Sequence, residues 1–465
     1  MYATMILEKI PFRLTNPLTP SKRRKTVKIV ALNGLLGYGY SEESLDIAFS
    51  EKVDYLGVDA GSTDPGPYYL GKGASFTARS AVKRDLALAL PKALEHKAPF
   101  IIGTAGGAGA EPHVAWVKDI LLEIASEKGL SFKLGVVLSD VSREYVIGKM
   151  RSSRVRNMSD DFPLTESAVN ESSRIVSQIS IAPIIELLEK KCDVILAGRA
   201  CDTAIYAAPC IFEGYDAGLA FHMAKIMECG AMCSEPVAAA DVMQAYISEG
   251  HFELRPANPI RKCTVERVAA HTLYEQGNPY LIYEPDGVCD LNESKFEQID
   301  PRTVRVYGSK FREAEVKTLK LEGVRLAGYR TICPATIYDP ETIRRIGEIT
   351  KTVGDFVKEN TKGRLPKDSY TLNVKTSGGE ESTLGIIIDV VGKTQDIADE
   401  VCALVRSRML HCDYAGRKSS AGNLAFPFSP SDVHVGEVYE FSVFHLVEVD
   451  SLSETAKLSV EEVGA

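Results

Sequence analysis

Five short apolar runs without polar residues at alternate positions lie in the first half of the chain and predict strands that are buried on both faces. They cover residues 27–32, 55–59, 100–103, 134–138 and 194–197. Helical patterns separate several of them, notably at residues 44–48, 115–128 and 182–190. This alternation is typical of a parallel sheet covered by helices on both faces. We therefore predict an α/β fold with a mostly parallel, doubly wound sheet and glycine-rich loops at the strand ends.

The pattern changes near residue 303 to alternating polar and apolar positions. Strands are predicted around residues 304–307, 315–321 and 384–391, and one long helix around residues 394–408. A chain of 465 residues exceeds one ordinary core. We predict a tail at residues 1–26, a ligand-binding α/β domain at residues 27–300 and a smaller α+β domain at residues 301–465.

Composition narrows the functional classes. The formal charge is −9 and no basic stripe is interleaved with aromatic residues, so we expect no nucleic-acid partner. No window approaches the roughly 18 apolar residues of a membrane span, and residues 1–16 lack the apolar core of a secretory signal. The ten cysteines show no CxxC spacing. We expect a cytoplasmic protein without a membrane partner and with reduced, packed cysteines.

The first glycine loop contains Gly34, Gly37 and Gly39 directly after a predicted strand. Such loops can hold an anion at a helix N-terminus, so Gly37 and Gly39 are candidate substrate contacts. The spacing departs from the GxGxxG fingerprint of dinucleotide-binding loops. We therefore expect no NAD.

The second loop, 59–64 (DAGSTD), combines two carboxylates with two hydroxyls at a strand end. Asp59 and Asp64 are candidate acid/base residues, and Ser62 and Thr63 are candidate substrate contacts. A divalent metal site and a clamp for sugar hydroxyls are alternatives, as is a structural Asx-turn with a helix cap. The cofactor stays unknown, with a divalent metal left open.

The third loop leads from glycines into an imidazole. Thr104, Gly106 and Gly107 could stabilise an oxyanion, while His113 moves a proton near neutral pH. A histidine near the start of a helix is also commonly a surface or capping residue.

The strand at residues 194–197 is followed by Arg199, Cys201 and Asp202. Arg199 could grip a substrate carboxylate or phosphate in a bidentate manner, and Asp202 is a second ligand contact. Cys201 has no basic partner that the sequence assigns, which favours inert packing.

A polar cluster near the C-terminus precedes residues 423–430 and could close over the pocket or contact a subunit. It comprises His411, Asp413, Tyr414, Arg417 and Asn423.

Four segments taken in order resemble the acyclic terpene utilisation family AtuA. They are 58–66 (VDAGSTDPG), 197–208 (AGRACDTAIYAA), 270–283 (AHTLYEQGNPYLIY) and 423–430 (NLAFPFSP). The resemblance covers residues 27–450 and implies a catabolic role involving CoA thioesters and a small companion subunit. It supplies no set of catalytic residues.

The leading hypothesis is a lyase, hydratase or isomerase that acts on a small carboxylic acid or its CoA thioester. His113 or Asp59 would be the base, and Arg199 would anchor a small anionic substrate. Thr104 and the amides of Gly106 and Gly107 would be the oxyanion donors.

The alternative is a non-catalytic subunit that binds an acyl-CoA or an organic acid, which exposure of Phe426 and Phe428 would favour. A nucleotide-dependent ligase or kinase ranks third because no P-loop motif is present. We expect a homo-oligomer, as for most large metabolic enzymes.

Overall fold

The computed structural model describes residues 26–61, 66–159, 162–378, 383–417 and 421–464. Contacts divide the chain into two compact units. The first contains residues up to 324 and returns for residues 441 onward, and the second contains residues 325–440. Residues 301–324 therefore pack within the first unit. The boundary that the sequence analysis places at residue 300 stays a prediction, since these units come from contacts within the structure.

A ten-stranded sheet forms the centre of the first unit. Its order is β14 (Lys295–Asp300), β15 (Thr303–Tyr307), β10 (His251–Pro256), β9 (Met243–Ser248), β1 (Thr26–Ala31), β2 (Tyr55–Asp59), β3 (Phe100–Gly103), β7 (Val194–Ala197), β4 (Phe132–Leu138) and β21 (Lys457–Val463). The five apolar runs of the sequence are β1, β2, β3, β7 and β4, and these pair in parallel.

The α/β class is confirmed, but the expectation of a mostly parallel sheet needs correction. Among the described strands the sheet has four parallel pairings and five antiparallel ones. The antiparallel strand β9 covers the edge of β1, and β21 covers the edge of β4. Strands such as β21 come from distant parts of the chain, so no local sequence pattern predicts that they pair with the parallel strands.

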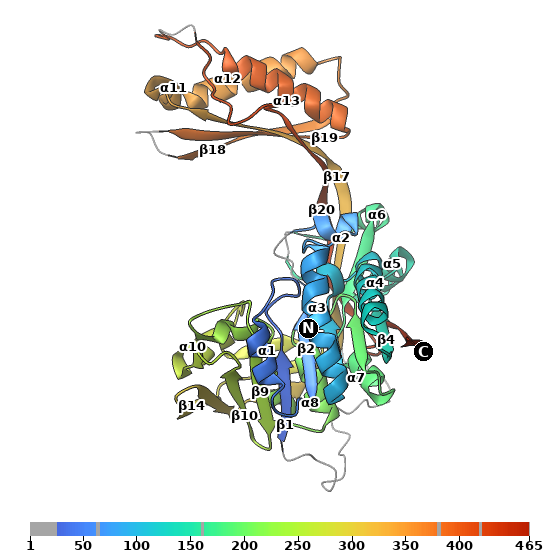
Figure 1. The fold of residues 1–465 in the computed structure, drawn as a ribbon. Helices are drawn as coiled ribbons and strands as arrows, with labels where there is room; N and C mark the ends of the chain where they lie inside the picture. The colour runs from blue at the N-terminus through green and yellow to red at the C-terminus, as the bar shows by residue number, and fades with distance from the viewer. Residues whose placement is uncertain (1–25, 62–65, 160–161, 379–382, 418–420, 465) are drawn as a thin grey trace. The chain divides into compact units, whose positions relative to one another are not determined.

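Helices pack against both faces of the parallel strands (Figure 1). One apolar cluster includes side chains of α1 (Glu42–Ala48), α3 (Arg79–His96) and α4 (Glu111–Lys128). The other includes side chains of α7 (Ala182–Glu189), α8 (Ala204–Phe212) and α9 (Ala217–Met227). Successive β3 residues alternate between the clusters, as the pleat requires. Burial on both faces explains why the sequence of these strands is continuously apolar.

Shorter elements complete the first unit. They are α2 (Tyr68–Lys72), η2 (Ala105–Gly107), α5 (Arg143–Arg151), β5 (Val155–Asn157), α6 (Glu166–Glu171), β6 (Arg174–Gln178), η3 (Gly230–Cys233), β8 (Ser234–Glu235), β11 (Lys262–Cys263), α10 (Val265–Thr272), β12 (Leu281–Glu284), β13 (Gly287–Asp290) and β16 (Lys310–Glu313). Two long strands, β17 (Thr318–Ile337) and β20 (Val433–Glu448), contribute to both units. Within the first unit β17 pairs with β6 and β20 pairs with β5.

The second unit has the order of elements β-α-β-β-α-β. After β17 come α11 (Pro340–Arg344), α12 (Ile346–Thr361), β18 (Tyr370–Gly378), β19 (Leu384–Gly392), α13 (Gln395–Leu410) and β20. The strands pair in the order β18-β19-β17-β20, which is the ferredoxin-like arrangement. Residues of α12 and α13 share an apolar core with the sheet (Figure 1). The α+β texture predicted for the C-terminal part matches this unit.

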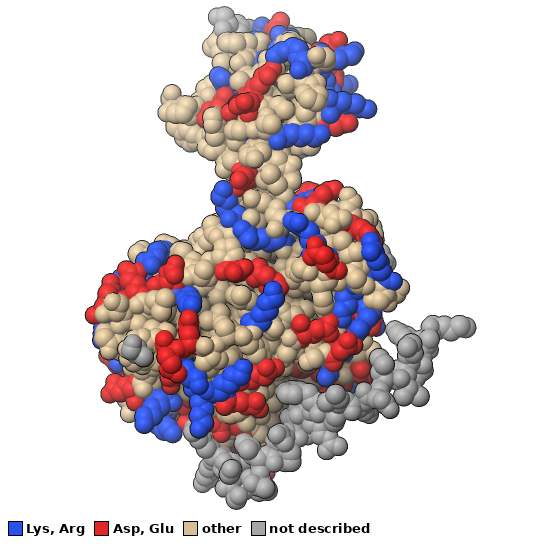
Figure 2. Space-filling model, turned by 90° about the vertical axis from the view of Figure 1, so that its right-hand side faces the viewer, with Lys and Arg blue, Asp and Glu red and all other residues tan. Residues whose placement is uncertain are grey.

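The surface seen in Figure 2 carries interspersed acidic and basic side chains. None of the helices in the described part of the chain is both long and apolar enough to span a bilayer.

The contact between β2 and α8 requires a glycine at position 57. A Cβ there would lie 2.5 Å from the Tyr206 ring, which is fully buried. We predict that Gly57→Ala lowers the free energy of unfolding by about 1–3 kcal/mol through overpacking, measured by urea denaturation. Gly148→Ala in α5 is the control, because its Cβ would meet no atom within 4 Å. Equal effects of the two substitutions would contradict the packing argument.

Candidate active site

Two adjoining cavities in the first unit share Asp202 and Glu228 in their walls. The small cavity has a volume of about 170 Å³ and is also lined by Asp59, Gly61 and Arg199. The large cavity has a volume of about 570 Å³ and extends past Lys225 and Glu284 to Lys320. Polar and charged groups therefore concentrate where the cavities meet.

The parallel strands explain why these residues meet. Asp59 is the last residue of β2, Thr104 follows β3, and Arg199 follows the end of β7. Because β3 lies between β2 and β7, the carboxyl ends of the three strands meet at one edge of the sheet. Glu228 follows the last residue of α9 and approaches from the helix layer. The structure brings Asp59, Thr104, Arg199 and Asp202 together at this edge, and their functional roles stay predictions.

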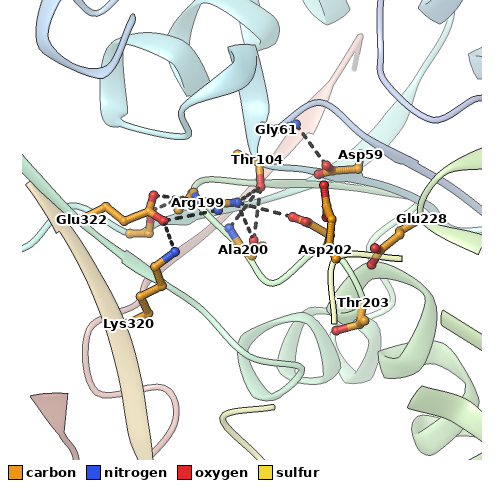
Figure 3. A network of polar contacts seen from close by, with 12 residues as sticks. Asp59, Gly61, Thr104, Arg199, Ala200, Asp202, Thr203, Glu228, Lys320 and Glu322 are labelled. Atoms are coloured by element: carbon orange, nitrogen blue, oxygen red, sulfur yellow. Dashed lines mark hydrogen bonds and ion pairs between the residues drawn. The ribbon is translucent and has the colours of Figure 1, made fainter. Parts of the chain in front are cut away.

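Arg199 occupies the centre of the polar network (Figure 3). Its Nε donates to Glu322 Oε2 at 3.0 Å, and its Nη2 donates to Glu322 Oε1 at 3.4 Å. Its Nη1 donates to the Ala200 carbonyl at 3.0 Å and to Asp202 Oδ1 at 3.4 Å. Both side chains of the Arg199–Glu322 pair are at most 5% exposed. Each of its three nitrogens thus already has a protein acceptor, which argues against the predicted role of Arg199 as an open substrate anchor.

Thr104 joins the β3 and β7 loops. Its Oγ1 accepts from the Ala200 amide at 3.2 Å and from Arg199 Nη1 at 3.3 Å. The residue is fully buried and has φ 41° and ψ 53°, a left-handed conformation that is unfavourable for a β-branched side chain. Strain of this kind persists only where the surroundings determine it, and it is frequent at functional sites.

Two carboxyl groups that line the small cavity, Asp59 and Glu228, have raised pKa values. Burial and the neighbouring Asp202 raise the pKa of Asp59 well above its ordinary value, although Arg199 opposes the rise. Asp59 Oδ2 accepts the Gly61 amide at 3.1 Å, whereas Oδ1 has no hydrogen-bond partner among the described residues. Burial also raises the pKa of Glu228 to about 8, with Lys225 opposing and Asp202 adding to the rise. The protonated form is therefore favoured in both acids, and the pKa of Glu228 lies near neutral pH.

The first glycine loop already holds an anion, and that anion belongs to the protein. The Gly37 and Gly39 amides donate to Asp85 Oδ2 at 3.0 and 3.1 Å. Asn33 Nδ2 donates to the same oxygen at 3.3 Å, and the Asp85 side chain is fully buried. These contacts satisfy the two amides that the sequence assigned to a substrate.

His113 is buried beside α2 and lines neither cavity. Its Nε2 lies 3.1 Å from the Tyr69 carbonyl oxygen and 3.2 Å from that of Ala74. Burial lowers its pKa, which disfavours the charged imidazole. Gly106 allows the close approach, because a Cβ there would lie 2.8 Å from the Cβ of His113. The catalytic role of His113 stays a prediction that this geometry does not favour.

The remaining predicted contacts fall into three groups. The Gly107 amide donates to the Thr104 carbonyl at 3.1 Å, so it closes a turn. Ser62, Thr63 and Asp64 lie outside the described residues. Cys201 lines the large cavity, but burial raises the pKa of its thiol well above the ordinary value, which favours an unreactive thiol.

The C-terminal polar cluster supports the end of α13. Asn423 Nδ2 donates to the carbonyls of Met409 at 3.1 Å and Cys412 at 2.9 Å. Arg417 Nη1 donates to the Cys412 carbonyl at 3.2 Å. These side chains satisfy carbonyls that a helix end leaves without intrahelical partners.

Sequence reasoning missed five charged residues named here, which are Lys225, Glu228, Glu284, Lys320 and Glu322. One signal was available, because Lys225 and Glu228 are charged residues three positions apart at the end of an otherwise apolar helical run. Lys320 Nζ lies 2.8 Å from Glu322 Oε1 on β17, far along the chain from the β7 loop. No preformed group of three or more His, Cys, Asp or Glu side chains suited to a metal occurs within the described ranges.

A family model described as acyclic terpene utilisation family protein AtuA matches residues 72–409. This span covers more than half of the chain. Comparisons with curated proteins and with solved structures found no match.

The Asp85 contacts generate a stability prediction. Asp85→Ala removes the acceptor of two buried amides and of Asn33, so it should lower the free energy of unfolding by about 3 kcal/mol in urea denaturation. Asp119→Ala, an exposed position on α4, is the matched control and should change it by less than about 0.5 kcal/mol. A loss below about 1 kcal/mol at Asp85 would show that the loop does not depend on this carboxylate.

The raised pKa of Glu228 predicts a pH dependence of stability. Between its ordinary value of 4.5 and about 8, the unfolded state releases this proton while the folded state keeps it. Glu228 therefore makes the free energy of unfolding fall as pH rises, by up to about 1.4 kcal/mol per pH unit. Denaturation between pH 5 and 8.5 should give a shallower slope for Glu228→Gln. The exposed control Glu189→Gln should keep the wild-type slope.

Proposed function

The chain belongs to the acyclic terpene utilisation family AtuA, and from that premise we propose a catabolic enzyme of the lyase, hydratase or isomerase type. Its substrate would be a small carboxylic acid or the CoA thioester of one. The three reaction types share the removal or addition of a proton beside a carbonyl group. The ten described cysteines are all free, which supports a cytoplasmic setting.

The observation that carries the proposal is the Asp59 carboxyl. It is 3% exposed and lines the small cavity, and its Oδ1 has no hydrogen-bond partner in the described part of the chain. An unpaired oxygen in a buried carboxyl is costly, and this cost is a reason to expect that Asp59 has a function beyond packing. Asp202 lies beside it (Figure 3) and is 37% exposed on its side chain. In this scheme Asp59 exchanges the substrate proton and Asp202 passes it to solvent.

Glu228 supplies a second role in the same scheme. Burial raises its pKa to about 8 although Lys225 Nζ donates to Glu228 Oε1 and opposes the rise, so the neutral acid, which can donate a hydrogen bond, is accessible near pH 7. A neutral acid in a buried site can stabilise the negative charge that develops on a carbonyl oxygen during proton abstraction. Glu228 therefore replaces the Gly106 and Gly107 amides as our preferred oxyanion donor.

The large cavity is suited to the body of the substrate. Its walls combine apolar side chains such as Ile282, Val288 and Leu446 with the cationic groups of Lys225 and Lys320. A volume of about 570 Å³ lies within the usual range of small-molecule sites. An apolar acyl chain with a polar end group fits this mixture of walls.

The non-catalytic alternative also has an observation in its favour. Tyr283, on the wall of the large cavity, and nearby Tyr280 in sequence are 65% and 57% exposed, and Phe428 is 52% exposed. Phe426 instead packs partly against the core of the second unit. Exposed aromatic side chains are frequent at partner contacts. A companion subunit or a second copy of the chain would then complete the activity.

Proton exchange in D₂O tests the proposal without knowledge of the full reaction. The pure chain is incubated with a panel of small carboxylic acids and CoA thioesters, and loss of the proton signal beside the carbonyl is followed by NMR. We predict exchange for one substrate class and a decrease of at least 100-fold in its rate for Asp59→Asn. Asp119→Asn, an exposed residue, should keep the wild-type rate.

Two outcomes would contradict the proposal. Unchanged exchange in Asp59→Asn would remove Asp59 from the chemistry. Tight binding of a panel member without any exchange would favour the non-catalytic subunit. His113→Ala is a further arm, since a loss of exchange in a folded variant would restore the histidine as the base.

A further inference from the structure

A groove in the second unit has no role in the fold or in the proposed reaction. It lies between α12 and β18, includes the intervening segment 362–368, and has a volume of about 1060 Å³. Four lysines line it, namely Lys351, Lys358, Lys362 and Lys367. Only Lys362 has an ion pair within 4 Å among the described residues, at 3.7 Å from Glu359. Three cationic groups in one groove are therefore left without carboxylate partners there.

Apolar and aromatic side chains also line the groove. Leu365, Tyr370, Leu372 and Val374 line it and are half-buried against the core of the second unit. Asp355, Asp368 and Asn373 add two carboxylates and an amide to the walls, so the four lysines leave an excess of positive charge. The groove thus combines a positive charge, an apolar surface and hydrogen-bonding groups, which suits an amphipathic anion.

Gly354 leaves room for a ligand on the part of α12 that lines the groove. Gly354 lies inside α12, where glycine costs about 1 kcal/mol relative to alanine. A Cβ there would meet no atom within 4 Å, so packing within the protein does not require glycine. Lys351 and Lys358 lie three residues before it and four after it, which places all three on one helix face. A flat group could lie against the bare backbone at Gly354 with its charged groups between the two lysines.

We propose that this groove binds an adenine-nucleotide-type ligand, in which a flat ring lies over Gly354 and phosphates contact Lys351 and Lys358. Phosphate groups bind lysine as point charges, and the ring would cover the apolar wall formed by Leu372 and Val374. A free nucleotide and the nucleotide part of CoA share this chemistry. The inference that the ligand is CoA rests on the proposed function, whereas the inference that the groove binds an adenine nucleotide does not.

Calorimetric titration of the full chain with ADP, CoA and tripolyphosphate tests the inference. We expect ADP or CoA to bind at micromolar to millimolar concentration and more tightly than tripolyphosphate. Preference for CoA over ADP would assign the source as the thioester carrier, and the reverse preference would assign a free nucleotide. Tripolyphosphate binding as tightly as the nucleotides would overturn the proposal, since the groove would then recognise charge alone. No binding of any of the three at millimolar concentration would overturn it as well.

Gly354→Leu is the decisive variant, because it fills the groove at a position where helix propensity favours the larger residue. Its melting temperature should stay equal or rise, while the affinity for the nucleotide falls at least tenfold. Gly347→Leu is the matched control on the same helix, since it also has no atom within 4 Å of its Cβ and does not line the groove. The double change Lys351→Glu with Lys358→Glu should give a similar loss of affinity.

Unchanged affinity in Gly354→Leu would place the ligand elsewhere and overturn the proposal. The result is separable from the proposed reaction, because calorimetry requires no turnover. Nucleotide binding at the groove with no proton exchange would uphold this inference and contradict the proposed function.

Discussion

The buried ion pair between Arg199 and Glu322 determines the arrangement of the candidate active site. It joins the loop after β7 to the first part of β17, and its Nε to Oε2 distance is 3.0 Å. Burying two charges is expensive, and Coulomb attraction alone seldom repays the cost. Here Lys320, Thr104 and the Ala200 carbonyl provide further hydrogen bonds and ion pairs. Burial would raise the pKa of Glu322, but Arg199 and Lys320 instead lower it to about 2, so the pair stays ionised.

Burial is the main cause of the raised pKa of Asp59, and the neighbouring Asp202 adds to it. Arg199 opposes the rise only in part, because the same guanidinium also contacts Glu322 and Asp202. Lys225 compensates Glu228 only in part, because burial dominates there. A site with more carboxyl groups than free cations can hold mobile protons near neutral pH, and this property links the ion pair to the proton-transfer chemistry that we propose.

The sequence predicted the local features of the fold and missed those that depend on distant contacts. Continuous apolar runs identified β1, β2, β3, β7 and β4, since burial on both faces leaves a local pattern. The glycine loop with Gly37 was predicted to bind a ligand because nothing nearby in sequence supplies an anion. Asp85, on α3, provides it from 48 residues away. Glu322 was missed for the same reason, since it lies 123 residues from Arg199 in the sequence.

The proton-transfer role predicted for His113 rests on the chemistry of imidazole. Sequence does not reveal whether an imidazole faces a cavity or, as here, the carbonyl of Tyr69.

Glycines show how structural and functional causes can be separated in this chain. A Cβ at Gly109 would lie 2.1 Å from the Arg199 amide nitrogen, so the close approach of two loops requires glycine there. Gly57 is required in the same way by the Tyr206 ring. Packing does not require glycine at Gly354, and the same holds for Gly347 in the same helix. Gly354 differs from Gly347 because it lines the groove with the lysines. The groove and its lysines therefore carry the ligand argument, and the absent side chain at Gly354 leaves room for that ligand.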